Sequence, residues 1–165
     1  EKLDVIWKKL LGIFKDYCSK EYIDILPGVY ELIISMAKSQ EFQLGLLTGN
    51  FQANAYQKLK TYFLDIFFPF GAFGDDREDR NQLPEIAIER ANKYAGNNKF
   101  STNNTLIIGD SEKDIECAKI NNLPVVSVAT GYVPIEELRD HKPDLIYDNF
   151  ANSDSVFEDI KKFLS

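Results

Sequence analysis

The chain has 165 residues, of which 44% are hydrophobic and 27% charged, a composition typical of one folded domain rather than of a disordered chain. Its formal net charge of -7 argues against a general nucleic-acid-binding surface, but a small anionic substrate could still bind in a local basic or metal-bearing pocket. No apolar run approaches the ~20 residues that a membrane-spanning helix needs, so we expect no membrane span.

The two cysteines, Cys18 and Cys117, lie far apart and lack metal-ligand spacing, which indicates a reducing compartment. No signal-peptide pattern is present, so we expect a cytoplasmic protein. The oligomeric state stays open at this level.

Helical and strand patterns alternate along the chain. Apolar residues spaced by three and four predict a helix over 3–17 and another that begins near Val29, after Pro27 and Gly28. The patterns then predict, in order, a strand at 42–48, a helix at 50–64, a strand-like segment at 65–74, a helix at 84–95, a strand at 104–110, a helix at 112–121, a strand at 123–130, a short helix at 134–140, a strand at 144–149 and a helix at 153–164. Since the strands are apolar on both faces, we predict an α/β fold with an open parallel sheet covered by helices on both sides.

Polar residues follow two of these strands. The first ends in Thr48-Gly49-Asn50 and the later one in Gly109-Asp110-Ser111. In open parallel sheets the ligand crevice lies beyond the carboxyl ends of the strands. Asp114 lies one helical turn after Asp110, and such a pair of carboxylates suits Mg²⁺, which fills its other positions with water and substrate phosphate.

A purely structural interpretation of the same residues stays open. Asp110 or Ser111 could cap the following helix, with Asp114 favourable in its first turn, and Thr48 could also be a helix cap. The two strand ends taken together favour a functional site.

The pair "LGLLTGN" and "IIGDSEKD" resembles the haloacid-dehalogenase-like hydrolase superfamily, most of whose members are Mg²⁺-dependent phosphatases. The resemblance covers about residues 26–150, and "GAFGDDREDRNQLPEIAIERA" is similar to the phosphoglycolate-phosphatase-like branch. It implies a three-layer Rossmann-like core over 26–165 and a remnant of a helical cap over 1–25.

The resemblance also implies roles for single residues. Thr48 would hydrogen-bond the transferring phosphoryl group of a small phosphorylated metabolite, with help from the backbone at Gly49 and Asn50. The basic third motif is best matched by Arg80, with Arg77 as the rival.

For the metal, the resemblance implies that Asp110 ligates Mg²⁺ directly. Asp114 would ligate the ion or orient its coordination shell.

The superfamily's first motif, "DxDxT", is absent. In the family, the first Asp of this motif attacks phosphorus to form an aspartyl-phosphate. In this chain Asp4 lies in a helical pattern, and Asp24 lacks the second Asp of the motif and is too near Thr48 to leave room for a cap, so we expect structural roles for both. In the family, the strand that carries this motif lies between the strands ending at Thr48 and Asp110. Its loss would leave two strands with unpaired backbone groups, at ~1–3 kcal/mol for each buried one. Because the first residue is Glu1, we expect the motif upstream, in a larger hydrolase whose inserted cap ends near residue 22.

Three functions are therefore compared. A phosphate-monoester hydrolase is the leading hypothesis, and a non-catalytic Mg²⁺- and phosphate-binding or protein-interaction module is the alternative. A signalling receiver domain is disfavoured because no strand is followed by the Lys that such a domain needs. The only histidine, His141, lies in a polar run and is expected at the surface.

Overall fold

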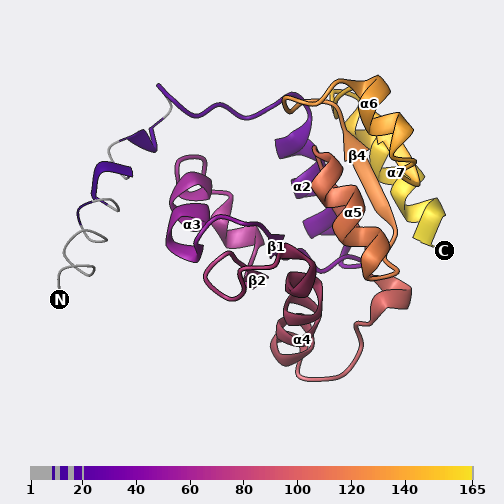
Figure 1. The fold of residues 1–165 in the computed structure, drawn as a ribbon, viewed down its shortest axis with the longest axis horizontal. Coiled ribbons are helices and arrows are strands. Elements are labelled where there is room, and N and C mark those ends of the chain that lie inside the picture. The colour runs from indigo at the N-terminus through magenta and orange to yellow at the C-terminus, as the bar shows by residue number, and fades with distance from the viewer. Residues whose placement is uncertain (1–8, 10–11, 15–16, 20, 165) are drawn as a thin grey trace.

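The computed structural model describes residues 9, 12–14, 17–19 and 21–164 (Figure 1). The predicted helix over 3–17 lies mostly outside these residues, as does Asp4. The described elements follow the predicted alternation, and their bounds are α2 (Val29–Ser39), β1 (Leu46–Leu47), α3 (Gln52–Lys60), η1 (Asp65–Phe67), β2 (Gly71–Ala72), η2 (Arg80–Gln82), α4 (Leu83–Ala95), η3 (Thr102–Asn104), β3 (Ile107–Gly109), α5 (Glu112–Ile120), β4 (Val125–Val128), α6 (Ile135–Asp140), β5 (Leu145–Tyr147) and α7 (Ser153–Leu164).

The strand-like segment predicted over 65–74 differs most from the structure. Its first part is the 3₁₀ helix η1, and only the two residues of β2 pair as a strand. Pro69 has no backbone N–H to donate to a sheet, and the carbonyl of Phe68 accepts a hydrogen bond from the Tyr56 hydroxyl at 2.9 Å instead of from a strand. Pairing with β1 therefore begins only at Phe70, whose carbonyl accepts a hydrogen bond from the Leu46 N–H at 3.1 Å.

The sheet is split into two parallel parts. β3, β4 and β5 form one sheet with β4 in the middle, and β1 pairs with β2 in the other. Among the described residues no strand joins β1 to β3. The predicted parallel α/β fold is thus confirmed, with its described strands in two separate sheets.

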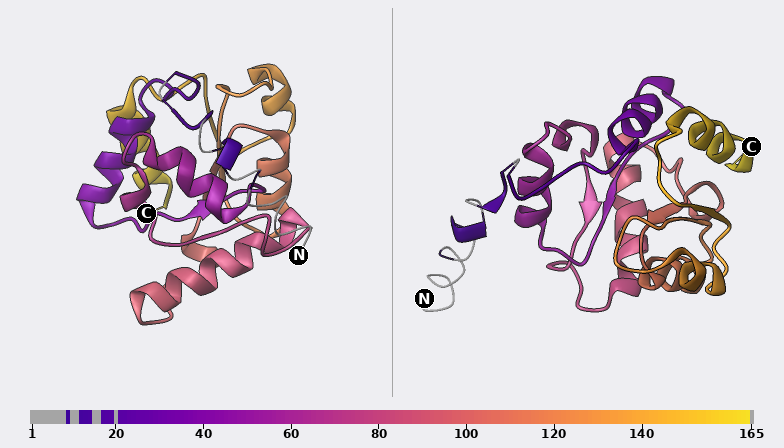
Figure 2. Two further views of the ribbon diagram at one scale, coloured as in Figure 1. Left: turned by 90° about the vertical axis from the view of Figure 1, so that its left-hand side faces the viewer. Right: turned by 90° about the horizontal axis from the view of Figure 1, so that it is seen from above.

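Side chains alternate between the two faces of β4. Val126 and Val128 pack against α2 and α7 in a cluster that includes Leu32 and Ile160. Val125, the strand residue before Val126, faces the other way and belongs to a second cluster formed largely by α5 and α6. Helices α2 and α7 pack against each other, and the right-hand view of Figure 2 shows them side by side. These clusters form the predicted three layers of helix, sheet and helix.

No helix within the described residues combines the length and the apolar character that a membrane crossing requires.

Candidate functional site

The polar residues singled out from the sequence lie at the carboxyl ends of β1 and β3. Thr48 follows β1 directly, and Asp110 follows β3. Arg80, in the loop after β2, forms an ion pair with Asp114, in the helix after β3. Since this bond links the segments that follow two strands of different sheets, the carboxyl ends of both sheets lie at the same edge, where α/β proteins bind ligands.

The loop after β1 is organised around the Thr48 side chain. Its Oγ1 atom accepts hydrogen bonds from the backbone N–H of Asn50 at 3.1 Å and from the Asn50 side-chain amide at 3.2 Å. The Asn50 carbonyl in turn accepts a bond from the backbone N–H of Gly74 at 2.9 Å. Among the described residues no acceptor is recorded for the hydroxyl proton of Thr48, and Gly49 and Asn50 are exposed.

Arg80 and Arg77 occupy different environments. Arg80 is partly buried on η2 and reaches Oδ1 of Asp114 through Nη2, whereas its Nε atom is buried without a partner among the described residues. Arg77 is exposed and donates to the backbone carbonyl of Asp76 at 2.8 Å. Only Arg80 therefore lies beside a carboxylate of the candidate site and keeps a donor unused.

Asp114 is buried, with 5% of its surface exposed. Its Oδ2 atom accepts hydrogen bonds from the Ser111 backbone N–H at 3.1 Å and the Ser111 hydroxyl at 2.6 Å, which is a capping box at the start of α5. A β-carbon on Gly109 would lie 2.2 Å from Cγ of Asp114, so this carboxylate packs directly over the end of β3. The Asp114 side chain therefore takes part in the cap of α5 and also lies at the candidate site.

Asp110 is exposed at the end of β3, and within the described residues its carboxylate has no recorded hydrogen bond or ion pair. A β-carbon on Gly131 would lie 2.5 Å from its Oδ2 atom, which places the carboxylate against the loop after β4.

A free carboxylate beside an engaged one suits Mg²⁺, which takes one or two protein carboxylates and several waters. The described residues contain no group of three or more His, Cys, Asp or Glu side chains that could enclose a metal ion by itself. Asp110 thus fits as a direct ligand, while Asp114, whose oxygens already bind Ser111 and Arg80, fits as an orienting group.

The loop that carries Arg80 is fixed by a second ion pair that the sequence analysis missed. Arg90 on α4 donates to both carboxylate oxygens of Asp76, at 2.6 and 2.7 Å, and to the Gly71 carbonyl at 2.7 Å. The hydrogen bonds from Arg90 lower the pKa of Asp76, and the same contact raises the pKa of Arg90. We call Asp76, Arg90 and Gly71 the loop clamp.

The same loop is joined to the segment after β1. Oδ1 of Asp75 accepts a hydrogen bond from the backbone N–H of Gln52, the first residue of α3, at 2.9 Å. The charged run "GDDREDR" has no local sequence pattern that predicts these contacts.

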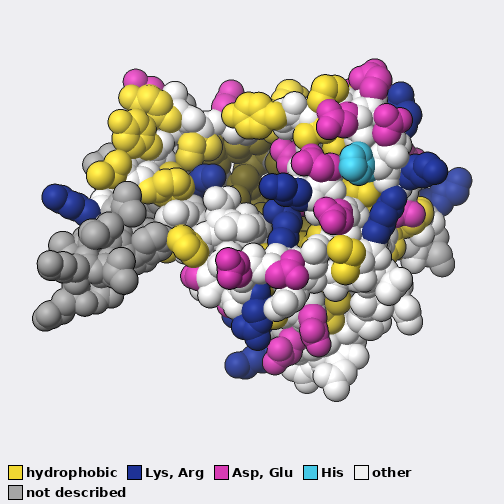
Figure 3. Space-filling model, viewed as in Figure 1, with side chains coloured by type: hydrophobic (Ala, Val, Ile, Leu, Met, Phe, Trp, Pro, Cys, Tyr) yellow, Lys and Arg dark blue, Asp and Glu magenta, His cyan; other side chains and the backbone are white. Residues whose placement is uncertain are grey.

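Cys117 and His141 are not among the groups that could bind a ligand at the candidate site. Cys117 is fully buried behind Arg80, where burial raises the pKa of its thiol. His141 is exposed, and Figure 3 shows this histidine on the surface among acidic and basic side chains. The exposure of His141 agrees with the expectation from the sequence.

Fold and site together define a Rossmann-like α/β protein whose candidate site lies at the carboxyl edge of a parallel sheet. A family model for haloacid dehalogenase-like hydrolases matches residues 1–128, and the chain belongs to this family.

The relatives agree with the branch that the motifs indicated. The chain is 26% identical to a phosphoglycolate phosphatase of Nitrosococcus oceani over 139 residues, which is 84% of this chain and 59% of the relative. It is 28% identical to a phosphoglycolate phosphatase of Mesorhizobium japonicum over 149 residues, covering 86% of this chain and 61% of that protein. The chain therefore spans about three fifths of the length of these curated relatives.

A solved structure has the same fold. The crystal structure of a β-phosphoglucomutase from Clostridium difficile superimposes with a TM-score of 0.68 at 25% identity, covering 93% of this chain and 61% of that one.

Proposed function

We propose that the chain forms part of a Mg²⁺-dependent hydrolase of small phosphate monoesters. The observation that carries this proposal is the contact of Arg80 with Asp114 over Gly109, beside the exposed Asp110. Cationic donors and metal-binding carboxylates at one edge of a sheet are what a phosphate ester requires. Family membership and the phosphoglycolate phosphatase relatives support the same reaction class.

The proposed roles follow from the donor and acceptor character of each group. Thr48 donates its hydroxyl proton to a phosphoryl oxygen, with the backbone N–H of Gly49 nearby, while the N–H of Asn50 holds the Thr48 oxygen in place. Arg80 neutralises phosphate charge with its remaining donors. Mg²⁺, when bound to Asp110, would offset negative charge on the phosphate. Asp114 orients Arg80 and the metal's surroundings.

The nucleophile comes from outside these 165 residues, since the sequence contains no "DxDxT". In the proposed reaction its carboxylate oxygen bonds to phosphorus while the bond between phosphorus and the ester oxygen breaks. The leaving alcohol takes a proton from a general acid. Water then cleaves the aspartyl-phosphate, which returns the carboxylate and releases inorganic phosphate.

The test compares two proteins in an assay with p-nitrophenyl phosphate, each with and without Mg²⁺. The 165-residue chain is expected to be inactive, and a form extended upstream through an in-frame "DxDxT" is expected to be active only with the metal. Absence of turnover in both forms would contradict the hydrolase proposal.

One observation favours the alternative of ligand binding without turnover. Both oxygens of Asp114 are already engaged by Arg80 and Ser111, and the described residues contain no complete metal cluster. A module of this kind would bind inorganic phosphate in calorimetry and show no turnover in the extended form.

A further inference from the structure

One hydroxyl group is fully buried in the three-stranded sheet without a recorded hydrogen-bond partner. Ser127, on β4, is 0% exposed, and no described residue is recorded as a partner of its Oγ atom. β4 has β3 on one side and β5 on the other, so this position lies inside the described fold and not at an open edge. Because a buried unpaired hydroxyl costs free energy, its presence indicates a second state in which the hydroxyl is paired.

The register of the strands shows which face of the sheet Ser127 occupies. Ile107 and Val125 are register partners, and both belong to the apolar cluster formed largely by α5 and α6. Gly109 and Ser127 lie two residues further along the same two strands and are also partners. Since residues two apart in a strand point to the same face, Gly109 and Ser127 both face α5.

The described strand neighbours of Ser127 on this face are apolar or lack a side chain. Three of them belong to the same apolar cluster, namely Val125, Ala129 and Ile146. The fourth is Gly109, and the space beside it holds the carboxylate of Asp114, whose Oδ2 atom would lie 2.5 Å from a β-carbon on this glycine. Neighbouring strands are about 4.8 Å apart, so this carboxylate is the polar side-chain group next to the Ser127 hydroxyl.

The two oxygens of Asp114 are not equally supplied with donors. Oδ2 accepts two hydrogen bonds from Ser111, whereas Nη2 of Arg80 is the one donor to Oδ1 recorded among the described residues. The guanidinium uses a single nitrogen here, without the two-point fork that makes such pairs strongest. Arg80 is thus held to Asp114 by one contact, and Oδ1 keeps the capacity for another donor.

We propose that Ser127 is a positioning residue that acts through Asp114. Its hydroxyl replaces Arg80 as the donor to the buried carboxylate when Arg80 turns toward a phosphoryl group. This inference deepens the proposed function and rests on it, because the phosphate is what draws Arg80 away. No covalent bond changes and no proton is transferred.

The energetic reason is the cost of a buried carboxylate oxygen without a donor. If Arg80 left Asp114 and nothing replaced it, Oδ1 would lose its recorded partner, and an unpaired buried acceptor costs more than the hydrogen bond itself contributes. Rotation of the Ser127 side chain between staggered positions, together with its freely rotating hydroxyl hydrogen, redirects a donor toward Asp114. The release of Arg80 to the phosphate thereby becomes less costly.

The first test needs no phosphate and follows urea unfolding of the 165-residue chain, or of the upstream-extended form if the shorter chain has no cooperative transition. Ser127→Ala should leave the unfolding equilibrium constant within about twofold of the parent or lower it, because the hydroxyl is unpaired while Arg80 is in place. In an Arg80→Ala background, the same change should raise that constant about fivefold or more. Arg80→Met replaces Arg80→Ala if the latter does not fold.

Val125→Ala is the matched control for this cycle. Val125 is buried on the same face of β4, with 1% of its surface exposed, and it has no side-chain donor. Its truncation should destabilise the parent and the Arg80→Ala variant by the same factor, as a packing defect does. A serine with a structural role alone would behave like this control.

The second test measures the affinity for inorganic phosphate by titration calorimetry in the presence of Mg²⁺, with the same protein. Ser127→Ala should weaken phosphate binding about fivefold or more, since Arg80 would then leave Asp114 without a replacement donor. Ser127→Thr keeps the hydroxyl and should retain most of the affinity. Val125→Ala should bind phosphate like the parent.

The two tests separate this inference from the proposed function. Coupling between Ser127 and Arg80 in the unfolding cycle would support the exchange of donors on Asp114 even if the parent binds no phosphate, a result that would count against the proposed function alone. Equal effects of Ser127→Ala with and without Arg80 would overturn the inference. Unchanged phosphate affinity in Ser127→Ala, in a parent that binds phosphate, would overturn it as well.

Discussion

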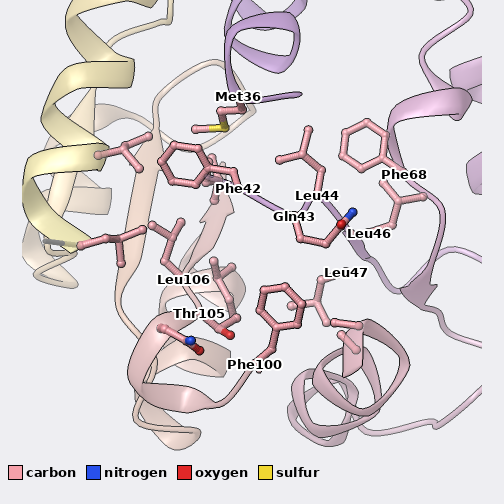
Figure 4. Close-up of a pocket in the computed structure, with 18 of the residues that line it drawn as sticks. Met36, Phe42, Gln43, Leu44, Leu46, Leu47, Phe68, Phe100, Thr105 and Leu106 are labelled. Atoms are coloured by element: carbon pink, nitrogen blue, oxygen red, sulfur yellow. The ribbon is translucent and has the colours of Figure 1, made fainter. Parts of the chain in front are cut away.

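The two parts of the sheet differ most clearly in how well their strands are buried. All four residues of β4, which has a neighbour on each side, are buried, whereas both residues of β1 are only half-buried. Ile115, in the helix that packs on β3, is 1% exposed, but Ile108 within β3 is 38% exposed. Equally apolar residues thus reach different burial because no described strand pairs with one edge of β1 and of β3. An apolar cavity of about 640 Å³ lies there, between residues 44–47 and 105–108 (Figure 4).

The two parts also bring different chemistry to the candidate site. The loops after β1 and β2 supply a hydroxyl and a guanidinium, Thr48 and Arg80, which suit phosphate oxygens. The segment after β3 supplies the carboxylates of Asp110 and Asp114, which suit a metal. In the proposed site, phosphate and metal would therefore be bound by separate half-sheets, which the ion pair between Arg80 and Asp114 joins.

The largest expected effect is on the metal side. In the upstream-extended form, Asp110→Asn should lower Mg²⁺-dependent kcat by about 10³-fold, roughly 4 kcal/mol, because the variant loses an anionic ligand for the metal. The measurement is a Mg²⁺ titration of p-nitrophenyl phosphate hydrolysis. Asp140→Asn, an exposed acid at the end of α6, serves as control, and unchanged rates in Asp110→Asn would refute the metal assignment.

On the phosphate side, Arg80→Gln should reduce kcat/KM by about 10²-fold through loss of a charged donor to the phosphoryl group. Arg80→Lys should recover part of this loss, because it restores the charge but not the planar fork. Arg77→Gln is the matched control, since Arg77 is exposed and contacts only the loop backbone through its recorded bond. A larger loss of kcat/KM in Arg77→Gln than in Arg80→Gln would mean that Arg77, and not Arg80, contacts the phosphoryl group.

Two isoleucines test the burial difference directly. Ile115→Ala should lower the free energy of unfolding by about 2–5 kcal/mol, as expected for a fully buried side chain. Ile108→Ala should cost about 1 kcal/mol or less, because its side chain is already partly in water. Urea unfolding of the 165-residue chain gives both values. Equal costs would mean that the cavity between β1 and β3 is closed in solution.

Much of this arrangement could be predicted from the sequence, and the failures have physical causes. Alternating helix and strand patterns located the elements because local periodicity follows burial, and the missing motif predicted the split between β1 and β3. The lengths of β1 and β2 were overestimated, since apolar residues such as Leu44 line a cavity here and do not pair. The contact between Asp76 and Arg90 depends on tertiary packing of a loop against α4, which no local pattern reveals.

The smallest expected effect concerns the loop clamp, which holds the Arg80 loop to the β1–β2 side. Asp76→Asn should lower the free energy of unfolding at pH 7 by about 1–2 kcal/mol, the lower part of the range for charged hydrogen bonds because Arg90 is more than a third exposed. Since Arg90 lowers the pKa of folded Asp76 below its unfolded value of about 3.9, the stabilisation is complete above that value. It disappears as the pH falls through the lower folded pKa.

Urea unfolding at pH 7 and again at pH 2–3 should therefore show a gap between parent and Asp76→Asn that narrows in acid. Glu78→Gln, an exposed acid in the same loop, should show no gap at either pH. If the clamp also positions the site, hydrogen exchange in residues 73–80 should be faster in Asp76→Asn at pH 7, while residues 125–128 of β4 keep the parental rate. Faster exchange in β4 as well would show that the ion pair between Asp76 and Arg90 stabilises the whole fold and not only the Arg80 loop.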